Sequence, residues 1–157
     1  WITMVQLPAV NTPQFGWCRS RLPDHPQPVP PIFQPEVAAE AVWHAAHRRR
    51  RELTVGGSAL AVIVGNTLLP WLGDRYLART GYGSQQVRGM PVPDDRPDNL
   101  FNPVPELAAT HGRFDSEAKT RSLQLALNQH ARSMVVTAGG ALAMGATLLT
   151  LRRLQRR

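Results

Sequence analysis

Proline is the residue type that most constrains what this chain can fold into. The 157 residues include fourteen prolines and twelve glycines, and most of these gather in clusters. Proline fixes the backbone angle φ and lacks an amide hydrogen, so a proline cluster is incompatible with the interior of a helix or a sheet. We therefore expect the two clearest clusters, 13–34 and 81–112, to be extended or loop-like. Regular structure is expected mainly between them.

A strand–helix–strand pattern occupies the first 57 residues. Residues 1–7 are rich in β-branched and large apolar side chains and end at a proline, which predicts a short strand. Pro35, Glu36 and a series of alanines predict a helix that ends in the basic run 47–51. Residues 53–55 predict a second strand. Two strands joined by a crossover helix indicate a parallel pair in an α/β sheet.

The middle of the chain is predicted to be a helical and proline-rich extension. Two helices are expected there, over residues 59–79 and 116–132. The first should be broken near Gly65 and Pro70, because glycine and proline disfavour the helix interior. The second should have its N-cap at Asp115 or Ser116.

Residues 133–151 form an uncharged, largely apolar segment between Arg132 and the arginines of the C-terminal tail. As a helix it would match the thickness of a bilayer's hydrocarbon core. Its small residues recur at a spacing that lets helices approach closely. We predict a membrane-associated helix of transmembrane length; an amphipathic or disordered tail is the alternative. Whether such a helix spans the bilayer or lies in its interface stays open.

Charge and cysteine content limit the classes of partner and compartment. The net charge of +7 and the pI near 11.2 point to an anionic membrane or nucleic acid. We do not expect nucleic acid, because the basic residues gather in two arginine runs rather than along a recognisable binding module. The single cysteine excludes an internal disulfide and suits the cytoplasm. His44 and His47 lack a third ligand, so no metal site is predicted.

Several segments together resemble the C-terminal half of a short-chain dehydrogenase/reductase, in particular longer bacterial members with a proline-rich extension. Leu7-Pro8-Ala9-Val10-Asn11-Thr12, which we predict to be a proline-containing loop after the first strand, resembles the segment that follows the sixth strand of that family. Residues 34–38 and 51–57 resemble its last helix and last strand. Asp74-Arg75-Tyr76-Leu77 and His111-Gly112-Arg113-Phe114-Asp115 resemble stretches of the extension.

The resemblance implies a fold and a cofactor. Residues 1–57 would be the C-terminal part of a Rossmann-like α/β domain, followed by the extension 58–132 and the apolar helix with its arginine tail, 133–157. The cofactor would be NAD or NADP, and the complete enzyme would transfer hydride between nicotinamide and a carbonyl or alcohol substrate. The residues that the resemblance assigns to cofactor binding are Pro8, Ala9, Val10 and Thr12. Ala9 stands where the family usually has glycine.

The residues that carry the family's chemistry are missing from this sequence. The family binds the dinucleotide on a Gly-x-x-x-Gly-x-Gly turn and moves a proton with a Tyr-x-x-x-Lys pair; neither pattern occurs here. No catalytic residue is therefore assigned. We expect the chain to be a fragment of an oxidoreductase and to be inactive alone. The alternative is a non-enzymatic, membrane-tethered interaction protein, and an oligomer is left open.

Overall fold

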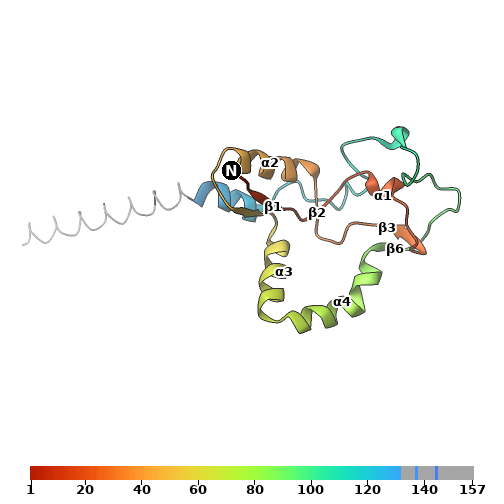
Figure 1. Ribbon diagram of the computed structural model, residues 1–157, viewed down its shortest axis with the longest axis horizontal. Coiled ribbons are helices and arrows are strands. Elements are labelled where there is room, and N and C mark those ends of the chain that lie inside the picture. The colour runs from red at the N-terminus through yellow and green to blue at the C-terminus, as the bar shows by residue number, and fades with distance from the viewer. Residues whose placement is uncertain (132–136, 138–143, 145–157) are drawn as a thin grey trace, which may run out of the picture.

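A computed structural model describes residues 1–131, 137 and 144 of the chain. Helix α2 lies against strand β1, and the helical residues 123–131 lie beside them (Figure 1). The helices α3 and α4 form an arc that leaves this region and returns to the chain near β3 and β6. The fold therefore consists of one packed body and a helical arc attached to it at both ends.

The predicted parallel pair and its crossover helix are confirmed. Strand β1 (Met4–Gln6) pairs in parallel with β5 (Glu52–Thr54), with Val5 opposite Leu53. Helix α2 (Pro35–Ala46) makes the connection between them. The chain is thus α/β in the described part, with small parallel sheets and helices consistent with a piece of a Rossmann-like fold.

Helix α2 forms for the reasons that the sequence indicates, but it is shorter than predicted. Pro35 occupies its first turn and Glu36 lies near the positive end of the helix dipole. The helix ends at Ala46, and the His47 ring nitrogen Nδ1 lies 2.8 Å from the carbonyl oxygen of Trp43. The arginine run 48–51 therefore follows the helix instead of forming its last turn.

One hydrophobic core joins residues that are far apart in the sequence. Leu53 and Val55 come from β5 and its end, and Val37, Ala41 and Ala45 form the buried face of α2. Phe33 precedes α2, while Leu125 comes from residues 123–131 and is 2% exposed. The last described helix is therefore held by the same core as the parallel pair.

The predicted start of that helix at Ser116 is wrong, because residues before 123 make extended pairing. The Lys119 amide donates to Ile32 (2.9 Å), and its carbonyl accepts from the Gln34 amide (3.0 Å). The helix instead begins at residue 123, and the Ser122 hydroxyl accepts a hydrogen bond from the Leu125 amide (3.3 Å). Ser122 is thus the capping residue, in place of Asp115 or Ser116.

The proline-rich stretches contain more regular structure than predicted. They hold α1 (Gln14–Trp17), β3 (Asp24–Pro26), β4 (Ile32–Phe33), β6 (Gln86–Pro91) and the 3₁₀ helix Pro105–Leu107, and β2 (Ala9–Val10) lies just before the first stretch. Strand β3 pairs antiparallel with β6, and β2 pairs in parallel with β4. Each of these sheets has two strands, so every strand is an edge strand. Proline is tolerated there because the amide that it lacks would point away from the partner strand and make no hydrogen bond in the sheet.

Helices α3 (Gly57–Leu68) and α4 (Pro70–Ser84) confirm one predicted break and contradict the other. The chain is interrupted at Leu69, directly before Pro70, as the proline predicts. Gly65 lies inside α3, so the break expected there is wrong; a single glycine costs a helix only about 1 kcal/mol. No residue of either helix is buried.

The predicted apolar helix 133–151 and the arginine tail lie outside the described residues, apart from Thr137 and Met144. Among the residues that the structure describes, no helix combines the length and the apolar character needed to cross a membrane.

Leu125 gives the test of this core. We expect Leu125→Ala to lower the free energy of unfolding by about 2–5 kcal/mol, because it removes a fully buried side chain and leaves a cavity. Leu123→Ala, on the same helix at a position 76% exposed, is the matched control and should change it by less than about 0.5 kcal/mol. Urea denaturation followed by circular dichroism measures both. Equal effects would mean that the helix is not seated in the core as described.

Candidate functional site

The residues predicted to bind the cofactor lie where β1 ends. Pro8 follows the strand, and Ala9 and Val10 form β2, which pairs with Ile32 and Phe33. The segment was predicted to be a loop, and this is wrong for its centre, because β4 supplies partners for its peptide groups. All four predicted residues, Thr12 included, are half-buried.

A cavity of about 420 Å³ opens beside this segment. Pro8 and Ala9 line it, together with Pro31 and with Val62 and Ile63 of α3. Val10 and Thr12 do not belong to its lining. The structure therefore places two of the four predicted residues at one apolar cavity and the other two outside its lining.

Thr12 carries an unsatisfied hydroxyl. Its Oγ1 is buried and has no hydrogen-bond partner among the described residues. A buried polar atom without a partner costs about 1–3 kcal/mol, so such atoms in native proteins call for a reason, such as a ligand or ion. Thr12 Oγ1 is thus an atom that a bound polar group could satisfy.

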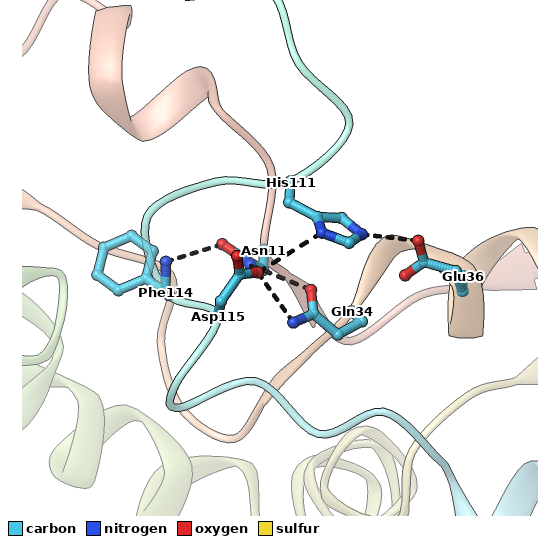
Figure 2. Close-up of polar contacts among 6 residues, drawn as sticks. All are labelled: Asn11, Gln34, Glu36, His111, Phe114 and Asp115. Carbon is cyan, nitrogen blue, oxygen red and sulfur yellow. Dashed lines mark hydrogen bonds and ion pairs between the residues drawn. The ribbon is translucent and has the colours of Figure 1, made fainter.

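Asn11, between the predicted residues Val10 and Thr12, is fully buried and was not predicted as a functional residue (Figure 2). Its Nδ2 donates to Gln34 Oε1 (3.1 Å) and to Asp115 Oδ1 (2.8 Å), while its Oδ1 accepts from the Phe114 amide (3.1 Å). A carboxylate can only accept and an amide N–H can only donate, so these partners fix the orientation of the Asn11 carboxamide. No local pattern in the sequence singles out Asn11, because its partners lie in distant segments of the chain.

The loop 111–115 lies directly on Asn11 and Thr12. The Gly112 amide donates to the Asn11 carbonyl (3.2 Å), and a Cβ at position 112 would collide with the Thr12 carbonyl oxygen and lie 2.6 Å from Asn11 Oδ1. Phe114 is buried and meets Phe15 edge-on, with ring centroids 6.0 Å apart. Two of the segments that the resemblance singled out, 7–12 and 111–115, thus form one site, whereas another, at residues 74–77, lies exposed on α4.

His111 connects this loop to the start of α2. Its Nε2 lies 2.7 Å from Glu36 Oε1, and its Nδ1 lies 3.7 Å from Asp115 Oδ1 (Figure 2). The hydrogen bond to Glu36 raises the pKa of His111, and the same bond lowers the pKa of Glu36. Each group therefore favours the charged form of the other.

The hydrogen bonds of this network position one segment of the chain against another. Its polar atoms are used by protein partners, which hold the loop 111–115 over the segment that follows β1. Among the described residues, no group of three or more His, Cys, Asp or Glu side chains is placed to hold a metal ion. The Thr12 hydroxyl is left without a partner, and Pro8 and Ala9 line an apolar wall beside it in the sequence.

Comparison with known proteins finds one informative relative. The chain is 30% identical over 101 residues to a protein of Bacillus subtilis (strain 168) described as an uncharacterized oxidoreductase, YxnA. The match covers 62% of this chain and 26% of that protein, so the chain spans about a quarter of the length of the relative. No family model matches the chain, and no solved structure matches it. The comparison therefore supports a likeness to an oxidoreductase and does not identify a subgroup of oxidoreductases.

Asn11→Leu tests whether this carboxamide holds the loop. The variant keeps the side chain's approximate size but leaves the Phe114 amide and part of the Gln34 and Asp115 side chains without partners. We expect the free energy of unfolding to fall by about 2–4 kcal/mol, and the Gly112 and Phe114 amides to exchange with solvent faster.

Asn102→Leu, in an exposed part of the chain, is the control and should leave both measurements nearly unchanged. Hydrogen exchange separates loop release from global unfolding, because only the former is confined to residues 111–115. Unchanged exchange at Phe114 in Asn11→Leu would contradict the assignment.

The His111–Glu36 pair predicts a pH-dependent contribution to stability. A raised pKa makes the contribution of His111 complete below its ordinary pKa of 6.5 and lost as pH rises through the folded value. The lowered pKa of Glu36 makes its contribution complete above the ordinary 4.5 and lost as pH falls through the folded value. The pair should therefore stabilise the fold most between about pH 4.5 and 6.5. His111→Gln should remove the pair's pH-dependent contribution to the free energy of unfolding.

An NMR titration of the His111 ring measures the pKa directly. In the native chain it should lie above the ordinary histidine value of 6.5, and Glu36→Gln should lower it. Glu40→Gln, on the same helix, is the matched control and should leave the His111 pKa unchanged. A His111 pKa that does not respond to Glu36→Gln would exclude the ion pair.

Proposed function

We propose that this chain supplies the nicotinamide-side wall of an NAD(P)-dependent oxidoreductase of the short-chain dehydrogenase/reductase type. The observation that carries the proposal is the unsatisfied Thr12 hydroxyl, in a segment that leaves the carboxyl end of a parallel strand. Ligands of open α/β sheets bind outside the carboxyl ends of the strands. The oxidoreductase among the chain's relatives supports the same class.

Each residue of the segment has a distinct part in this proposal. Pro8 and Ala9 present an apolar wall that suits a flat ring and excludes water from it. The Thr12 hydroxyl satisfies a polar group of the cofactor, such as a carboxamide, and Val10 keeps the strand in place through its pairing with Phe33. When bound, a nicotinamide cofactor supplies or accepts the hydride.

The loop 111–115 keeps this wall rigid. It fixes Asn11 through the Phe114 amide and Asp115, and its Gly112 packs on the Thr12 backbone. A binding group is effective only when neighbouring contacts hold it in position. The network of Figure 2 is thus the support of the proposed cofactor wall.

The proton-transfer machinery has to come from elsewhere. Tyr76 and Tyr82 are followed four residues later by Thr80 and Gln86 instead of lysine, and the glycine-rich turn is absent from the sequence. The chain therefore contributes to binding and positioning in this proposal, and carries no catalytic residue for hydride transfer.

The coding sequence upstream of Trp1 gives a direct test. The proposal expects it to encode, in the same frame, a glycine-rich turn and a Tyr-x-x-x-Lys motif. In a protein with both parts, Thr12→Val should raise the KM for the cofactor, whereas the exposed Thr110→Val should not. An upstream reading frame without either motif would contradict the proposal.

The chain of 157 residues should be inactive by itself. Purified protein mixed with NADH or NADPH and a panel of aldehydes and ketones should show no oxidation of the cofactor above the blank, measured at 340 nm. An intact short-chain dehydrogenase assayed in parallel verifies the panel. Turnover proportional to the concentration of the chain would refute the view that it lacks catalytic residues.

A further inference from the structure

A second cavity lies at the opposite end of α2 from Glu36. Its volume is about 510 Å³. Its walls include His44 in the last turn of α2, His47 at the C-cap of the helix, and the following residues Arg48, Arg49 and Arg50. It shares no lining residue with the apolar cavity beside Pro8. This cavity is therefore separate from the proposed cofactor wall.

The remaining wall comes from the helical residues 123–131. Asn128 and Gln129 complete the lining, which contains no carboxylate. Gln129 Nε2 donates to Glu40 Oε1 (3.0 Å), so one acidic side chain lies behind this wall. Three arginines thus line a space that is otherwise bordered by side-chain amides and imidazoles.

Two of the three arginines have free guanidinium groups within the described chain. Arg48 and Arg49 are exposed, and neither side chain makes a hydrogen bond or an ion pair to a described residue. The carbonyls of the last helical turn do not compete for them: Ala45 and His44 accept backbone N–H groups, and His47 Nδ1 contacts the Trp43 carbonyl. The negative end of the helix is therefore largely satisfied before the arginines begin.

The third arginine fixes the geometry of the run. Arg50 donates from its guanidinium to the Asn128 side chain (3.4 Å) and to the Asn128 carbonyl (3.2 Å). Its own carbonyl accepts from Trp1 Nε1 (3.1 Å) and Thr3 Oγ1 (2.7 Å). Arg50 thus ties the end of the arginine run to the residues before β1 and to the helical residues 123–131. Because the backbone next to Arg48 and Arg49 is already held, less conformational entropy is lost when these arginines bind a ligand.

His44 adds an unused polar atom to the same cavity. Its Nε2 is buried and has no hydrogen-bond partner among the described residues. Burial lowers the pKa of His44, and the positive charges of Arg50 and Arg48 lower it further, which favours the neutral ring. An anion with several acceptor oxygens would satisfy both the guanidinium groups and a His44 N–H.

From these features we infer that the cavity binds a phosphate group. Arginine presents planar, paired donors that match phosphate oxygens, and charge-assisted bonds of this kind are the strongest available at a surface. A neighbouring cavity of about 540 Å³ shares His47, Arg48 and Arg49 but has apolar walls that include Val5 and Val42. The ligand class is therefore a phosphate ester with an apolar portion, supplied either by a small soluble ester or by an anionic phospholipid.

The test compares two double variants with the same change in net charge. Arg48→Gln/Arg49→Gln alters the cavity, and Arg75→Gln/Arg79→Gln alters exposed arginines of α4. Phenyl phosphate is titrated by calorimetry, and vesicles of phosphatidylcholine with and without phosphatidylglycerol are tested by cosedimentation. The cavity variant should weaken binding by about tenfold or more, and the α4 variant by less than about threefold.

The two arms distinguish the source of the phosphate. Saturable binding of phenyl phosphate alone assigns a soluble ester, and binding that requires phosphatidylglycerol assigns a phospholipid; either supports the inference if the cavity variant abolishes it. Circular dichroism verifies that both variants are folded. Failure of both probes to bind, or equal losses in the two double variants, would overturn the inference.

Discussion

Asn11 has no access to solvent, so its carboxamide has to find all its partners within the protein. It finds them in Gln34, at the start of α2, and in Phe114 and Asp115, a hundred residues later. Hydrophobic contacts alone would hold these segments near each other without fixing their register. The directional bonds of one buried amide set the position of the loop 111–115 over Thr12, and with it the shape of the proposed cofactor wall.

Helix α2 links the two sites that the structure presents. Its first turn carries Glu36, which holds His111, and its last turn leads into the arginine run around the second cavity. At 1.5 Å per residue its twelve residues separate these ends by about 18 Å. Its middle face, through Val37 and Ala41, is packed in the core, so the helix connects the His111–Glu36 pair to a cationic cavity as one rigid element.

The sequence was sufficient where structure depends on local pattern. The parallel pair, the start of α2 at Pro35 and the interruption before Pro70 all follow from propensity, capping and proline geometry. It was insufficient where distant contacts decide. The pairing of Lys119 with Ile32 and Gln34 delays the last helix to residue 123, and the pairing of β2 with β4 turns a predicted loop into a strand. The role of Asn11 had no local signature either, since its partners lie in segments that only the fold brings together.

The hydrogen bond between Asn11 and Asp115 joins residues 104 positions apart. Closing so long a loop costs more chain entropy than forming the strand–helix–strand unit, and contacts of high sequence separation form slowly. We therefore expect the chain to acquire its parallel pair first and the loop 111–115 last. The proposed cofactor wall would then exist only in the final folded state, and any intermediate would present Thr12 without its cover.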